Sequence, residues 1–97
     1  MFPYDFIRSK GKRCNKRKGT VLAKFRIHNK TMPNGQIHNA LVARNECENY
    51  CAAKEDCWGC SVDCEKNCHW NALQDCGVQE DYSGIIDGDI TQKPGNV

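Results

Sequence analysis

The sequence predicts a small disulfide-rich α+β domain in which one short helix packs on a small antiparallel sheet. Three observations support this fold class. Eight cysteines occur in 97 residues, and seven of them lie between Cys47 and Cys76. Leu, Ile, Val and Phe together number only 17, which is few for a core that must hold by itself. Segments with strand patterns flank a single segment with helical character.

The first half of the chain predicts an arm followed by two strands. Residues 1–19 are basic and contain two glycines, and we expect an N-terminal arm tethered to the body through Cys14. Residues 20–28 alternate apolar with charged or polar side chains, which predicts a half-buried strand. Residues 32–35, Met-Pro-Asn-Gly, favour a turn, and residues 36–44 are expected to return as a second, less regular strand.

A short helix is expected to begin at Asn45. This residue can cap the free amides of a first turn, and Glu48 stands three positions later, as in a capping box. Cys47 and Cys51 would then lie one turn apart on the same face.

The second half predicts strands at residues 58–63 and 66–70, then one edge strand within residues 82–90. The expected organisation is an arm at 1–19, a cysteine-rich domain at 20–90 and a tail at 91–97.

Cysteine at this density indicates either a disulfide framework in an oxidising compartment or a metal site. Disulfides would supply the rigidity that the thin apolar core lacks, at roughly 3 kcal/mol for each loop of fifteen to twenty residues. The alternative is zinc, bound by two sets of four thiolates or with His69 replacing one of them. Cys57-Trp-Gly-Cys60 has the two-residue spacing that suits one ion or a redox pair, but the other close pairs do not.

One cysteine pattern resembles a known family. Cys47-x3-Cys51 on the predicted helix precedes Cys57-x-Gly59 at a predicted strand, and Cys68 lies in the next strand. Over residues 20–70 this arrangement resembles the PAN/apple family of extracellular modules. The resemblance implies a protein or carbohydrate partner and the pairings Cys47–Cys68 and Cys51–Cys57. Two further bridges of undetermined pairing would join the remaining cysteines, one of them fastening the arm to the body: Cys14, Cys60, Cys64 and Cys76.

Charge is divided sharply along the chain. Residues 1–44 carry eleven Lys or Arg against one acid, and residues 45–97 carry three Lys against eleven acids. A basic segment of this kind can contact an acidic protein or an acidic glycan, or it can fold against the acidic half of its own chain. Nucleic acid is an unlikely partner because few aromatic side chains accompany the lysines. The predicted binding residues are Lys10, Lys12, Arg13, Lys16, Arg17, Lys18, Lys24, Arg26 and Lys30.

Other motifs add little chemistry. Asn29-Lys30-Thr31 is a glycosylation acceptor in a secreted protein. No catalytic motif occurs, so we expect a protein that is not an enzyme and needs no cofactor or metal. Asp87-Gly-Asp89 is expected to be an ordinary acidic turn. Both tryptophans, Trp58 and Trp70, are expected to pack in the core beside the cystines.

These observations predict a disulfide-stapled binding module, extracellular or on the cell surface, without a membrane span. The first residues lack the features of a signal peptide, so we expect that Met1 is not the natural start. One alternative is a structural subunit of an extracellular or virion assembly. Another is a zinc-binding effector or nucleic-acid-binding protein.

Overall fold

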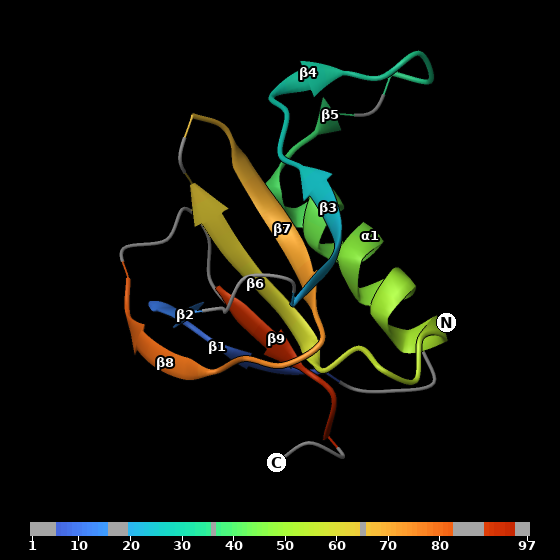
Figure 1. Ribbon diagram of the computed structural model, residues 1–97. Helices are drawn as coiled ribbons and strands as arrows, with labels where there is room; N and C mark the ends of the chain where they lie inside the picture. The colour runs from blue at the N-terminus through green and yellow to red at the C-terminus, as the bar shows by residue number, and fades with distance from the viewer. Residues whose placement is uncertain (1–5, 16–19, 36, 65, 83–88, 95–97) are drawn as a thin grey trace.

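The computed structural model describes residues 6–15, 20–35, 37–64, 66–82 and 89–94 (Figure 1). In chain order the elements are β1 (Ile7–Ser9), β2 (Lys12–Asn15), β3 (Val21–Arg26), β4 (Lys30–Thr31), β5 (Ile37–His38), α1 (Ala40–Ala53), β6 (Gly59–Cys64), β7 (Cys68–Leu73), β8 (Val78–Asp81) and β9 (Ile90–Gln92).

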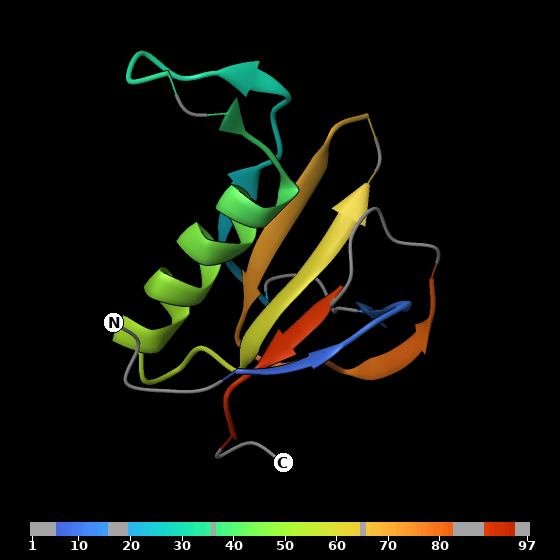
Figure 2. The ribbon, with the colours of Figure 1, turned by 180° about the vertical axis from the view of Figure 1, so that it is seen from behind.

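Within the described residues, a five-stranded antiparallel sheet has the order β1-β9-β6-β7-β3. Two smaller antiparallel pairs, β2-β8 and β4-β5, lie outside it. Helix α1 covers one face of the sheet, and the β2-β8 ribbon lies toward the opposite face (Figures 1 and 2). The predicted α+β fold class is therefore confirmed, with three layers where the ribbon is present.

Helix α1 starts earlier than the sequence pattern predicts. Asn39, not Asn45, is the cap, and its side-chain oxygen accepts hydrogen bonds from the amides of Leu41 at 3.0 Å and Val42 at 3.3 Å. The longer helix is favoured because Ala40 and Ala43 extend the buried face that continues through the two helical cysteines. The expected strand at residues 36–44 is wrong except for β5.

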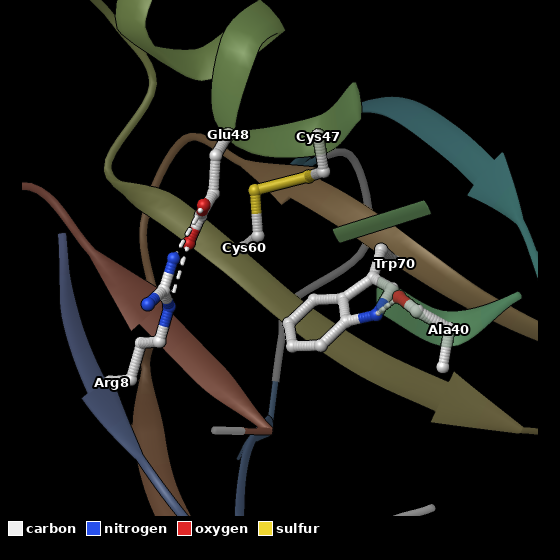
Figure 3. Close-up of polar contacts among 6 residues, drawn as sticks. All are labelled: Arg8, Ala40, Cys47, Glu48, Cys60 and Trp70. Carbon is white, nitrogen blue, oxygen red and sulfur yellow. Dashed lines mark hydrogen bonds and ion pairs between the residues drawn. A yellow bond between two sulfur atoms is a disulfide. The ribbon is translucent and has the colours of Figure 1, made fainter. Parts of the chain in front are cut away.

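The two faces of the sheet follow directly from strand register. Phe25, Trp70 and Val62 lie opposite one another across β3, β7 and β6. Trp70 and Val62 belong to the buried core beneath α1, and the partly buried Phe25 packs against it. Trp70 is completely buried, and its indole nitrogen donates to the carbonyl of Ala40 at 3.1 Å (Figure 3). The predicted core role of Trp70 is confirmed, and β3, β6 and β7 lie close to their expected positions.

A second, smaller core lies on the outer face, beneath the β2-β8 ribbon. It contains Cys14, Leu73, Cys76 and Ile90, with the half-buried Trp58 and Val21 packed against it. The backbone amide of Cys14 also donates to the Ser61 hydroxyl at 3.0 Å, which connects the ribbon to β6.

The described residues near both ends of the chain are part of the body. Strand β1 pairs with β9, and β9 pairs with β6, so residues expected in an arm and a tail complete the main sheet. Ile90 and Thr91 are fully buried. Gly59 permits this close approach, because a Cβ atom there would lie 2.8 Å from the Cα of Gln92. Of the strand expected at 82–90, residues 83–88 lie outside the described residues, as does most of the Asp87–Asp89 turn.

Candidate functional site

All eight cysteines form disulfides. The pairs are Cys14–Cys76, Cys47–Cys60, Cys51–Cys57 and Cys64–Cys68. No free thiol remains among them, so the zinc alternative has no thiolate ligands and Cys57–Cys60 is not a redox pair. Cys14–Cys76 fastens the basic N-terminal segment to the body, as expected.

The pairing Cys47–Cys68, implied by the family resemblance, is wrong, whereas Cys51–Cys57 is confirmed. Cys60 lies on the helix-facing side of β6, with its Cα 6.4 Å from that of Cys47 (Figure 3). Cys68 begins β7 directly opposite Cys64, and their Cα atoms are 4.1 Å apart. Because the β6-β7 hairpin places these two residues face to face, Cys68 is bridged locally and Cys47 joins Cys60.

A charged pair also links α1 to the sheet. Both Glu48 carboxylate oxygens accept hydrogen bonds from the Arg8 guanidinium, at 3.0 and 3.3 Å (Figure 3). The Glu48 side chain is fully buried, while that of Arg8 is 44 % exposed. Two-point pairing of this kind satisfies a buried carboxylate that would otherwise be costly to desolvate. Arg8 therefore has a structural role, because it neutralises the buried Glu48.

Two of the predicted binding residues are paired within the ribbon. Lys12 and Asp81 face each other across β2 and β8 and contact at 2.5 Å, and Arg13 contacts the neighbouring Glu80 at 2.7 Å. The hydrogen bond to Glu80 is the main cause that raises the pKa of Arg13, and the charges of Glu80 and Asp63 add to it. Lys12 and Arg13 therefore follow the alternative given above, in which the basic half of the chain pairs with the acidic half of the same chain.

The other predicted cations are distributed differently. Lys24, Arg26 and Lys30 are exposed on β3 and β4, and no salt bridge is recorded for them in the described part of the chain. Arg26 donates to the side-chain oxygen of Asn67 at 3.0 Å. Lys10 is exposed in the turn between β1 and β2. Lys16, Arg17 and Lys18 lie outside the described residues.

A polar pocket opens on the outer face of the sheet, beside the end of the β6-β7 hairpin. We call it the outer pocket. Its volume is about 190 Å³, and it is lined by Lys24, Asp63, Lys66, Asn67, His69 and Asn71. The strand register explains why four of these residues lie together. Asp63 and His69 are direct cross-strand partners, as are Lys24 and Asn71. Residues opposite each other in antiparallel strands project to the same face, so the pocket is a product of strand pairing.

A second pocket of about 160 Å³ lies between the ribbon and the sheet. It is lined by Arg13, Cys14, Asn15, Asp63 and Glu80. Asp63 borders both pockets, so they are neighbours on one surface. In the second pocket Arg13 is already paired with Glu80, whereas the outer pocket contains two lysines for which no ion pair is recorded in the described part of the chain. The outer pocket is therefore the better candidate for an anionic ligand.

Of the residues that line the outer pocket, sequence analysis predicted only Lys24 as a binding residue and named His69 only as a possible zinc ligand. It did not identify Asp63, Lys66, Asn67 or Asn71. The sequence contained a signal for His69 and Asn71, because they alternate with the apolar Trp70 and Ala72 and therefore share one face of β7. Alternation does not show which strands pair with β7, so it could not predict the other residues of the pocket.

Three further observations concern expected features. The side chain of Asn29 is exposed, so its glycosylation motif is sterically accessible, although its use remains a prediction. Among the residues that the structure describes, no helix is long and apolar enough to cross a membrane. No cluster of three or more metal-ligating side chains occurs in the same residues.

Comparison with known proteins gives no relative. The chain matches no protein-family model, and no similar curated protein or solved structure was found. The function must therefore be argued from the disulfides, the faces of the sheet and the outer pocket.

Proposed function

We propose that this protein is a non-enzymatic binding module, secreted or displayed at the cell surface, that recognises an anionic partner through the outer face of its sheet. The observation that carries the proposal is the unequal pairing of its cations. Lys12 and Arg13 contact acids of their own chain, whereas Lys24 and Lys66 line an open pocket. Exposed cations grouped on one face attract acidic proteins and acidic glycans.

The extracellular part of the proposal is supported by the four disulfides. Such bonds persist in oxidising compartments and are typical of small secreted domains. Resemblance to PAN/apple modules points to the same location and to a protein or carbohydrate partner. An accessible Asn29 is compatible with passage through a glycosylating compartment.

The proposal is tested by removing four cations that form no salt bridge with another described residue. Lys24, Arg26, Lys30 and Lys66 are all exposed, so a K24S/R26S/K30S/K66S variant should fold normally. Binding to immobilised dextran sulfate and to poly-glutamate should weaken by about tenfold or more, since each exposed pair contributes ~0.2–1 kcal/mol. The salt dependence of the affinity should fall as well.

The matched control is K12S/R13S, which removes two cations of the same chemistry from the ribbon. Because these residues are already paired with Asp81 and Glu80, the control should lose much less affinity. Equal losses in both variants would indicate a diffuse response to net charge and would contradict a localised binding face. Absence of binding by the unmodified protein to either polyanion would refute the proposed function.

A further inference from the structure

We infer that the open edge of β3 binds an extended acidic segment of a partner protein, which adds to the sheet as an antiparallel strand. This inference rests on the proposed function, because Lys24 and Arg26 belong to the proposed binding face, and it adds the class of the partner. Among the described strands, β3 and β1 border the five-stranded sheet, and β3 has six residues against three in β1. In Figure 1, β3 stands at the border of the sheet, beside β7 and in front of α1.

The register shows which backbone groups of β3 are turned outward. The amide of Ile27 donates to the carbonyl of Cys68 at 2.9 Å. In an antiparallel ladder this bond flanks a pair that exchanges no hydrogen bonds, here Arg26 with His69. Lys24, two residues earlier, is paired with β7 in the same way, because the two types of pair alternate. The backbone N–H and C=O groups of Lys24 and Arg26 therefore point away from β7, and no hydrogen bond from them to a further described element is recorded.

The burial of β3 is that of a strand with an open edge. None of its six residues is buried, and Lys24 and Arg26 are exposed. On the inner face, Phe25 is half-buried, and the centroid of its ring lies 5.8 Å from that of Tyr50 in α1. Helix α1 therefore packs on the inner face of β3 without burying the strand.

Charge along this edge selects an acidic occupant. Lys24 and Arg26 are exposed on one face of β3, and no salt bridge is recorded for either among the described residues. Like charges directly opposite each other destabilise a strand pair, and opposite charges stabilise one. A second copy of β3 would place cations beside cations, so self-pairing is disfavoured. A strand with two acidic side chains, two residues apart, would place one beside each cation.

The residue between the two acids would lie opposite Phe25. Because side chains alternate along a strand, it would project to the helix side and cover the exposed part of the Phe25 ring. The expected segment is therefore acidic, apolar and acidic in three successive residues. An acidic glycan supplies the charge but not a row of amides and carbonyls matching those of Lys24 and Arg26. The open backbone groups thus favour a protein partner.

The experiment titrates the intact protein with the peptide Thr-Glu-Val-Glu-Thr, blocked at both ends, and follows amide NMR signals. In antiparallel pairing the two glutamate amides face β3, and the amides of valine and the last threonine face away. N-methylation of both glutamates should weaken binding by about tenfold or more, because two backbone hydrogen bonds are lost. N-methylation of valine and the last threonine adds the same two methyl groups and should leave the affinity unchanged.

Hydrogen exchange tests the same contact from the side of the protein. The amides of Lys24 and Arg26 should exchange more slowly when the peptide is bound, because they become hydrogen-bonded. The amide of Phe25 is turned toward β7 and should change little. Unchanged exchange at Lys24 and Arg26 under saturating peptide would contradict strand addition.

The charges are tested separately from the backbone. A K24T/R26T variant keeps residues that favour strands and should bind the peptide about fivefold more weakly. Replacing both glutamates by glutamine should weaken binding to the unmodified protein by a similar factor and make little difference to the variant. K12T/R13T is the matched control, because it removes two cations that are already paired in the ribbon, and it should lose much less affinity.

The outcomes separate the inference from the proposed function. Loss of binding only with the glutamate-methylated peptide supports strand addition at β3. Equal affinity of all three peptides, or an equal loss with both methylated ones, overturns it while the proposed function stands. Binding of dextran sulfate without binding of the peptide also overturns it and leaves a glycan as the partner. If the unmodified protein binds neither probe, the inference and the proposed function both fail.

Discussion

The two faces of the central sheet are built from the same strands but have different consequences. On the helix side, Val62 and Trp70 are buried beneath α1, and the buried carboxylate of Glu48 accepts a hydrogen bond from Arg8. On the outer side, the β2-β8 ribbon covers only part of the surface, and Asp63 and Asn71 line an open pocket. The helix-facing side is therefore buried along its length, whereas part of the outer side is open to solvent, and that part is the binding face that we propose.

The same contrast applies to charge. Glu48 is fully buried and held at two points, whereas the ribbon pairs of Lys12 and Arg13 are exposed. Exposed pairs contribute little to stability, because water and salt screen them. Their main effect is to neutralise cations on the ribbon, which leaves Lys24 and Lys66 as the cations of the outer pocket.

The largest effect should come from removing the bridge that attaches the ribbon. In the entropic model, loss of Cys14–Cys76, with a sequence separation of 62, costs about 4 kcal/mol of unfolding free energy. Loss of Cys64–Cys68, with a separation of 4, should cost only about 2 kcal/mol. Urea unfolding of C14S/C76S and C64S/C68S measures the difference. Equal losses would mean that the ribbon does not depend on its disulfide.

A smaller effect tests the buried ion pair against an exposed one. Glu48→Gln should reduce the free energy of unfolding by about 1.5–3 kcal/mol, because a buried, charge-assisted pair is weakened. Glu80→Gln is the matched control in the ribbon, and it should change stability by less than about 1 kcal/mol. Thermal or urea unfolding of both variants is the measurement, and similar losses would contradict the difference between the two faces.

The smallest effect concerns pH. Burial lowers the pKa of His28 below 6.5, and the charges of Lys30 and His38 add to the shift. The unfolded chain therefore binds a proton more readily than the folded one. This contribution to stability is complete above the unfolded pKa and is lost as pH falls through the folded value. Thermal unfolding of His28→Gln between pH 8 and 5 should show a weaker pH dependence than the unmodified protein, and an unchanged slope would contradict this assignment.

Local patterns were sufficient for much of the fold. Alternation predicted β3, strands were expected close to β6 and β7, and the spacing of Cys47 and Cys51 placed both on one helical face. The shortage of aliphatic residues predicted a covalent framework, and all eight cysteines are bridged. The strand and helix-face predictions depend on residues close in sequence, where backbone periodicity determines which side chains share a face, and the covalent framework follows from composition.

Three features of the structure could not be predicted from the pattern of residues close in sequence. The partner of Cys47, the insertion of β9 between β1 and β6, and the grouping of Asp63, His69 and Asn71 all depend on strand order and register.

The amino-acid sequence by itself determined that this protein is a cystine-stabilised α+β domain with a basic first half. Only the tertiary structure decided which cations are neutralised and which ones line a pocket. The physical reason is that charge and side-chain type are local properties. The distance between two side chains on different strands is set by how the whole sheet assembles.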